Sequence, residues 1–190
     1  MASGQWTHFY LARLFVLFQQ NDRAIRAFRG ALAANPQFDR AASCLGHLHA
    51  SMGNGDLAAQ SFLQTLRIKP TDAVTHFNLG FVYGEQKKHE QAIVAFQEAV
   101  RLNPKIDRAW YGMGLSHASL GRHEAATEAF EKATRLQPMS PYPWYHLAMA
   151  HYMLEHDDKV RDITDHLETF DPKVMRRLGE DTPRVNARRD

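Results

Sequence analysis

The sequence has little of what stabilises a β-rich or a disulfide-bonded protein. It contains a single cysteine, Cys44, which cannot form an internal disulfide, as is usual in a reducing compartment. We interpret Cys44 as a small, partly buried side chain. Only 8 valines and 5 isoleucines occur among 190 residues, whereas Ala, Leu, Gln, Glu, Arg and Lys are abundant. Because the abundant types favour helices and the rare ones favour strands, we expect an all-α protein.

Charge and hydrophobic runs exclude two classes of partner. The 23 basic and 21 acidic side chains give a net charge of +2, which is too even for a nucleic-acid footprint or an anionic membrane surface. The apolar run from Phe9 to Phe18 is interrupted by Arg13 and is far shorter than the roughly 20 residues of a membrane span. The first residues lack the basic segment and cleavage site of a signal peptide. We therefore expect a cytoplasmic protein with no nucleic-acid partner and no membrane insertion.

Motifs of catalysis and metal binding are also missing. There is no GxSxG nucleophile turn, no GxxxxGK[ST] phosphate loop and no HExxH. Eleven histidines are present, but none is followed by another four residues later, the spacing that places two imidazoles on one metal. We predict that the protein is not an enzyme and holds neither a metal nor a cofactor.

What the sequence does contain is a period of 34 residues. Five of its eight prolines follow this period: Pro36, Pro70, Pro104, Pro138 and Pro172. Phenylalanine recurs eight residues before the first four of them, and alanine twelve residues before. Within each period the apolar positions fall in two stretches with helical spacing, which predicts a repeated helical hairpin.

Further columns indicate how the two helices of a hairpin pack. A leucine or methionine in the first helix is followed each time by alanine or glycine, as in Leu79 and Gly80. We expect the small residue to bring the two backbones close together, with the phenylalanine filling the volume beside that contact. Each second helix is expected to begin at an acid that favours the positive end of the helix dipole. These acids are Asp22, Asp56, Glu90, Glu124 and Asp158.

The pattern resembles the tetratricopeptide repeat, a 34-residue helix–turn–helix with Leu-Gly, an aromatic residue, Ala, Phe, Ala and Pro at fixed offsets. The third and fourth units match it best, through residues such as Leu79, Gly80, Phe96 and Phe130. The resemblance implies a right-handed α-solenoid of ten helices of about 12–14 residues, roughly two-thirds helix and no sheet. Five units fit, at 5–38, 39–72, 73–106, 107–140 and 141–174.

The C-terminal part departs from the pattern. In the fifth unit Val160, Thr164 and Leu167 stand where Ala, Phe and Ala are usual, so we expect its second helix to be a partly solvated cap. A short turn over 173–178 would complete a single domain, residues 1–178. Residues 179–190 are expected to form a polar, frayed tail whose arginines, Arg184, Arg188 and Arg189, are solvated.

The resemblance also implies the function. Proteins of this family present a concave groove lined by their first helices, so we expect a non-enzymatic scaffold or adaptor that binds a peptide or helix of a partner protein. Asn78 stands where some members grip a peptide backbone, while the lysine and asparagine set of the carboxylate-clamp subclass is missing. The candidate groove residues are Phe77, Asn78, Phe81, Arg108, Tyr111, Leu115, Tyr145, His146 and Met149.

Two alternatives remain open for these residues. The groove aromatics could serve only as packing between neighbouring first helices. The chain could also be a regulatory or substrate-binding subunit of an assembly whose catalytic part lies on another chain. His49, His117 and His151 occupy a core column and are expected to be packed and hydrogen-bonded.

The N-terminal edge offers a separate candidate. The first unit has no predecessor in this sequence, yet Leu14 and Phe18 occupy the offsets at which a first helix packs on the preceding unit. Since the ends of a repeat stack normally need a polar cap, we expect this edge to dock on something. Self-association as a homodimer is the simplest hypothesis, and another partner or an upstream segment are its alternatives.

Overall fold

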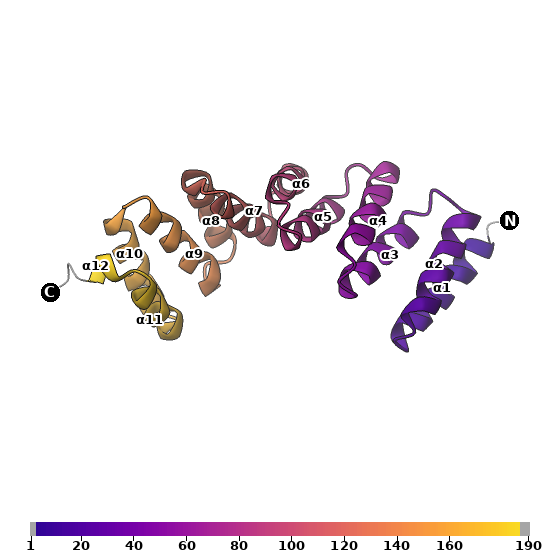
Figure 1. Ribbon diagram of the computed structural model, residues 1–190, viewed down its shortest axis with the longest axis horizontal. Helices are drawn as coiled ribbons and strands as arrows, with labels where there is room; N and C mark the ends of the chain where they lie inside the picture. Colours follow the sequence, from indigo (N-terminus) through magenta and orange to yellow (C-terminus); the bar gives the residue numbers. More distant parts are fainter. Residues whose placement is uncertain (1–2, 187–190) are drawn as a thin grey trace. The chain divides into compact units, whose positions relative to one another are not determined.

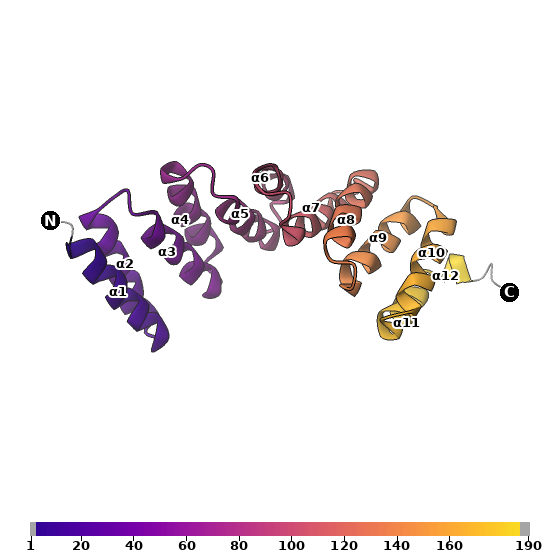
Figure 2. The same cartoon turned by 180° about the vertical axis from the view of Figure 1, so that it is seen from behind.

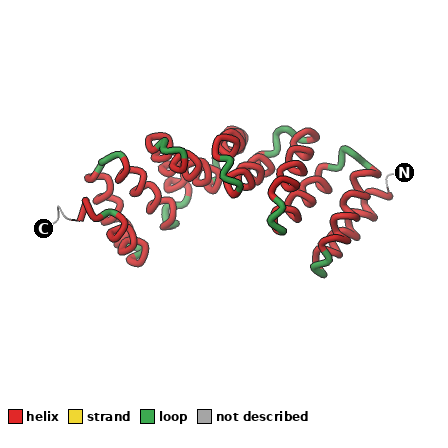
Figure 3. The backbone as a smooth tube through the Cα atoms, in the orientation of Figure 1, coloured by secondary structure: helices red, strands yellow, loops and turns green. Residues whose placement is uncertain are grey.

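The structure is a computed structural model that describes residues 3–186. Helices make up 81% of these residues, and no strand occurs among them. Figure 3 shows helices joined throughout by short loops. The all-α prediction is therefore confirmed. None of the described helices is both long enough and apolar enough to cross a membrane.

The chain divides into two compact units, Met1–Lys88 and His89–Asp190. In the first unit each helix packs on the next one along the chain (Figure 1). Its core contains Phe28, Ala31, Phe38, Leu45 and Leu48. The helices of this unit are α1 (Ser3–Leu17), α2 (Asn21–Ala34), α3 (Asp39–Ser51), α4 (Gly55–Ile68) and α5 (Ala73–Glu85).

The second unit has the same succession of packed helices (Figure 2). Phe130, Leu147, Val160, Leu167 and Leu178 belong to its core. Pro141 and Pro143 lie in the first turn of α9, where the missing N–H groups cost little. The helices are α6 (His89–Leu102), α7 (Asp107–Ser119), α8 (His123–Leu136), α9 (Pro141–Met153), α10 (Asp157–Glu168), α11 (Pro172–Asp181) and α12 (Pro183–Asn186).

The pairing of small and large residues confirms the expected hairpin contact. A Cβ atom added to Gly114 of α7 would lie 2.6 Å from Cδ1 of Phe130 in α8. At Gly46 of α3 it would lie 2.7 Å from Cε1 of Phe62 in α4. Both phenylalanines are almost completely buried. Only a residue without a side chain allows this approach, because real Cβ contacts are never so short.

The acids at the starts of the second helices also lie where expected, in the first turns of α2, α4, α6, α8 and α10. Two of them link one hairpin to the next. Asp56 of α4 pairs with Lys88, which follows α5, at 3.0 Å, and Glu90 of α6 pairs with Arg122, which precedes α8, at 2.5 Å. Hydrogen bonds from these cations lower the pKa of both carboxyls.

The C-terminal segment differs from the prediction. Instead of a short turn over 173–178, α11 runs over ten residues and α12 follows it. Leu178 and Val185 are buried in the same core as Val160 and Leu167 of α10. The residues of α10 that depart from the repeat pattern are therefore buried rather than solvated. The cap of the repeat stack is formed by α11 and α12, because these helices carry the apolar residues that pack on α10.

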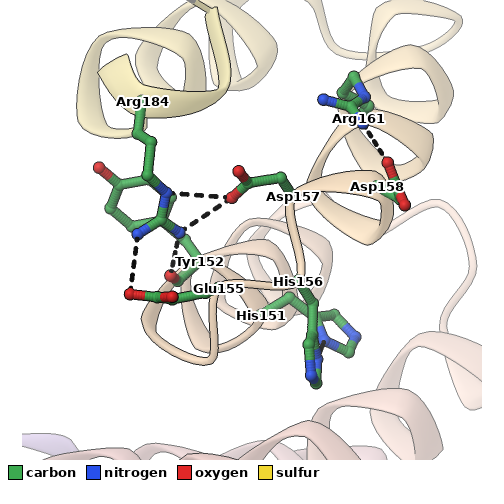
Figure 4. A network of polar contacts seen from close by, with 8 residues as sticks. All are labelled: His151, Tyr152, Glu155, His156, Asp157, Asp158, Arg161 and Arg184. Atoms are coloured by element: carbon green, nitrogen blue, oxygen red, sulfur yellow. Dashed lines mark hydrogen bonds and ion pairs between the residues drawn. The ribbon is translucent and has the colours of Figure 1, made fainter. Parts of the chain in front are cut away.

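Arg184 was expected to be solvated, and this was wrong. Its guanidinium donates to Oδ1 of Asp157 at 2.9 and 3.1 Å and to the carbonyl oxygen of Tyr152 at 2.7 Å (Figure 4). It also lies 4.3 Å from the centroid of the Tyr152 ring and 3.8 Å from a carboxylate oxygen of Glu155. Because Asp157 is 8% exposed, its charge needs this partner, and the arginine fastens α12 to the start of α10. The other tail arginines, Arg188 and Arg189, lie outside the described residues.

Candidate functional site

Three candidate residues lie on α5 in the first unit. Phe81 is 54% exposed, whereas Phe77 and Asn78 are half-buried. The amide nitrogen of Asn78 donates a hydrogen bond to Nε2 of His47 on α3, 3.3 Å away. Burial lowers the pKa of His47, which favours the neutral imidazole that can accept this bond. An asparagine amide has a second N–H and a carbonyl oxygen, so this contact uses only one of its groups.

A hollow that the sequence did not reveal lies beside His47. It has a volume of about 730 Å³, lies between α1 and α3, and reaches down to Phe28 of α2. Most of its walls are apolar. The residues that line it are Tyr10, Arg13, Leu14, Val16, Leu17, Phe28, Cys44, His47, Leu48 and Ser51.

A smaller hollow of about 370 Å³ shares Tyr10, Arg13 and Cys44 with the first. Its lining is about equally polar and apolar and includes two acids and two further bases: Asp39, Asp72, Arg40 and Lys69. Cys44 lies between the hollows, and burial raises the pKa of its thiol, an effect that nearby Arg13 only partly opposes. A thiol with a raised pKa is protonated near neutral pH, so Cys44 lines the two hollows as a neutral side chain and is not a nucleophile.

In the second unit the candidate aromatics of α7 and α9 pack together. The ring centroid of Tyr111 lies 5.9 Å from that of Phe130 and 5.7 Å from that of His146. His146 stacks on Phe130 at 5.8 Å with an angle of 25° between the rings. Burial lowers the pKa of His146 and raises that of Tyr111. These two side chains therefore fill space between α7 and α9, as the packing alternative expects.

Tyr145 is held by α11. Its hydroxyl donates to Oδ2 of Asp181 at 2.5 Å, and the guanidinium of Arg177 lies 5.1 Å from its ring centroid. Leu115 and Met149 are half-buried against the same core. Among the candidates of this unit, only the side chain of Arg108 on α7 is exposed.

Family models described as tetratricopeptide repeat match residues 11–73, 73–106 and 107–140, which is more than half of the chain. The chain belongs to the tetratricopeptide repeat family. Two of these matches have the boundaries that the proline period predicts.

Solved structures of tetratricopeptide repeat proteins share the fold. One described as MamA protein has 23% identity, with 97% of this chain and 96% of that chain covered and a TM-score of 0.81. YrrB, described as a TPR protein with an unusual peptide-binding site, has 19% identity, coverages of 91% and 90%, and a TM-score of 0.80. A repeat protein from Parabacteroides merdae ATCC 43184 has 18% identity, coverages of 96% and 73%, and a TM-score of 0.82. No curated protein matches the sequence.

The repeat explains which site residues were missed. In a tetratricopeptide repeat protein the first helices carry equivalent positions 34 residues apart, and Arg13, His47, Phe81, Leu115 and Met149 form one such column. The predicted groove was centred on the later units, because aromatic residues gather there. The same column of concave positions includes Arg13 and His47, and in the structure these two residues line the larger hollow.

The predicted N-terminal edge is exposed in the structure. Leu14 of α1 is 49% exposed, and Phe18, which follows α1, is 64% exposed.

Proposed function

We propose that this tetratricopeptide repeat protein is a non-enzymatic scaffold or adaptor that binds a peptide or helical segment of a partner protein along its first helices. Proteins of the family are in general non-catalytic interaction modules. One observation carries the proposal. His47 lines the apolar hollow and also bonds to Asn78, so the hollow and the α5 candidates form one continuous surface within the first unit.

The chemistry of this surface suits a peptide. The hollow can take apolar side chains, and Phe81 adds an exposed aromatic ring of the kind that contributes most to binding at interfaces. The remaining groups of the Asn78 amide can bond to a peptide backbone, and Arg13 can pair with a carboxylate of the ligand. The structurally similar YrrB, described as a TPR protein with an unusual peptide-binding site, supports the same class of ligand.

The α7 and α9 candidates have a smaller part in the proposal. Of these residues Arg108 is exposed, and Tyr111, Tyr145 and His146 are packed against neighbours. We expect truncation of Phe81 to weaken ligand binding more than truncation of Tyr145 does, because a hot spot must be available in the unbound protein.

The test uses peptides selected from a random library on the purified full chain. Their dissociation constants are measured for the wild type, for Phe81→Ala, for Asn78→Ala and for the control Leu63→Ala, which removes an exposed side chain of α4. We expect Phe81→Ala to weaken binding by tenfold or more, about 1.4 kcal/mol, and Leu63→Ala to leave it unchanged. Equal affinities for the wild type and Phe81→Ala would place the ligand elsewhere and refute the proposal.

The same proposal includes the cytoplasmic location and the lack of a nucleic-acid partner, for which localisation by microscopy and binding assays with DNA and RNA are the tests. Self-association through the N-terminal edge, Leu14 and Phe18, is a second proposal, and sedimentation equilibrium of the full chain is its test.

A further inference from the structure

The smaller hollow of the first unit gathers cations from three segments of the chain. Its lining comes from α1, from α3 and from the end of α4 with the connection to α5. Arg13 belongs to α1, Arg40 to the first turn of α3, and Lys69 directly follows α4. All three residues are exposed, so their charged groups can reach a ligand that enters the hollow.

These cations have no carboxylate partner within the described part of the chain. None of the ion pairs in residues 3–186 includes Arg13, Arg40 or Lys69. The guanidinium of Arg40 instead lies 5.9 Å from the ring centroid of Trp6, a contact that keeps it on the side of α1. The three side chains are therefore available to an anionic group of a ligand.

The two acids of the hollow serve the starts of helices. Asp39 lies in the first turn of α3, where the positive end of the helix dipole favours its charge. Asp72 precedes α5 and accepts a hydrogen bond from the hydroxyl of Thr75 at 2.8 Å. With these acids the lining has a net charge of +1. This charge matches one carboxylate and is too small for the roughly two negative charges of a phosphate group.

The smaller hollow adjoins the larger, apolar one. Arg13, Tyr10 and Cys44 line both, so the two hollows are neighbours on one surface of the first unit. A ligand that fills both must therefore carry an apolar group and an anionic group close together. In a peptide, an aspartate or glutamate beside a large apolar residue supplies this combination.

We infer that the ligand of the first unit is an acidic peptide segment. An apolar side chain of the peptide enters the larger hollow, and a neighbouring carboxylate pairs with Arg13, Arg40 and Lys69 at the smaller one. Each guanidinium can bond to both oxygens of a carboxylate, and the lysine adds a further positive charge. The inference rests on the proposed function, because it names the class of peptide that the same surface binds.

Peptides selected from a random library on the full chain provide the probe. We expect the selected sequences to be enriched in Asp or Glu next to a large apolar residue. One such peptide is compared with an analogue in which the acid is replaced by the uncharged amide, Asn or Gln. On the wild type in low salt, the analogue is expected to bind about tenfold more weakly, and added salt should reduce the difference because it screens exposed charges.

Two variants locate the carboxylate. The double variant Arg40→Gln, Lys69→Gln changes only exposed residues outside the core and leaves Arg13, which lines both hollows, in place. It is expected to lose most of the preference for the acidic peptide over its analogue. Arg67→Gln removes an exposed cation of α4 that lines neither hollow, and this control is expected to keep the full preference.

The outcomes separate this inference from the proposed function. Equal affinity of the two peptides for the wild type, an unchanged preference in the double variant, or the same loss in Arg67→Gln would overturn the inference, while peptide binding itself would stand. Tighter binding of a peptide with phosphoserine in place of the acid would overturn the assignment to a carboxylate. A library that yields no peptide for the full chain would refute the proposed function and the inference with it.

Discussion

Replacing Gly114 with alanine tests the contact on which every hairpin depends. The new Cβ would lie 2.6 Å from two carbons of the Phe130 ring, which is 0% exposed and cannot move without shifting its neighbours. Overpacking of this kind costs about 1–3 kcal/mol of folding free energy. Alanine in place of glycine in a helix gains roughly 1 kcal/mol, so we expect a net loss of about 0–2 kcal/mol.

The chain supplies a matched control in Gly84. This glycine also lies in a first helix, but a Cβ placed there would meet nothing within 4 Å. Gly84→Ala is therefore expected to stabilise the protein by up to about 1 kcal/mol. The two variants have the same chemical change and the same propensity gain, and so the difference of about 1–3 kcal/mol between them measures the contact alone.

The assay is urea denaturation followed by circular dichroism, with Phe130→Leu as the second arm of a double-mutant cycle. Leucine lacks Cε1 and Cζ, two of the three ring carbons that the added Cβ would meet, so Gly114→Ala should cost less in that background, by about 0.5–2 kcal/mol. If Gly114→Ala is as stable as Gly84→Ala, or if its cost is the same in both backgrounds, close packing against Phe130 is not what the glycine provides.

Three further predictions concern other parts of the fold. Phe96→Ala should lower the free energy of unfolding by about 3–5 kcal/mol in urea denaturation, and a loss below about 1 kcal/mol would contradict its burial. Arg184→Ala should cost roughly 1–3 kcal/mol in the same assay because it leaves buried Asp157 without this partner, whereas Arg161→Ala, whose partner is exposed, should change stability little. Burial, and secondarily Arg29, lowers the pKa of His49, so the unfolded chain binds a proton that the folded chain does not. Stability should therefore fall as the pH drops below the ordinary value of about 6.5, and His49→Tyr should weaken this dependence in denaturation curves measured across that range.

The sequence predicted the hairpins because each repeat must make the same contact. The contacts of Gly46 with Phe62 and of Gly114 with Phe130 are equivalent. The residues that make this contact therefore recur at a fixed spacing in the sequence and can be recognised without a structure. The C-terminal helices could not be recognised in this way. Leu178 lies outside the columns of the 34-residue pattern. The segment around it is polar on average, and one buried leucine is too little to predict a packed helix there.

The candidate site could likewise be predicted only in part from the sequence. Phe77, Tyr111 and Tyr145 share one column and Phe81 lies in another, but whether each side chain is exposed depends on what packs beside it. Tyr145 is engaged because α11 extends far enough to bring Asp181 to its hydroxyl, and that extension was not predictable. The contact of Asn78 with His47 joins residues of two hairpins, and the hollow beside it depends on the separation of α1 from α3. Sequence columns identify which residues can face a ligand, and only the packing decides which of them do.

The two proposed surfaces meet at α1, and this has a thermodynamic consequence. Leu14 and Phe18 form the edge proposed to pair with a second copy, and Leu14 also lines the apolar hollow proposed to take peptide side chains. A second copy lying over these side chains changes the mouth of the hollow, so dimerisation and peptide binding cannot be independent. By linkage, whatever factor the dimer applies to peptide affinity, the peptide must apply to dimer affinity. A substitution at Phe18, which does not line the hollow, therefore separates the two activities, whereas a substitution at Leu14 changes both.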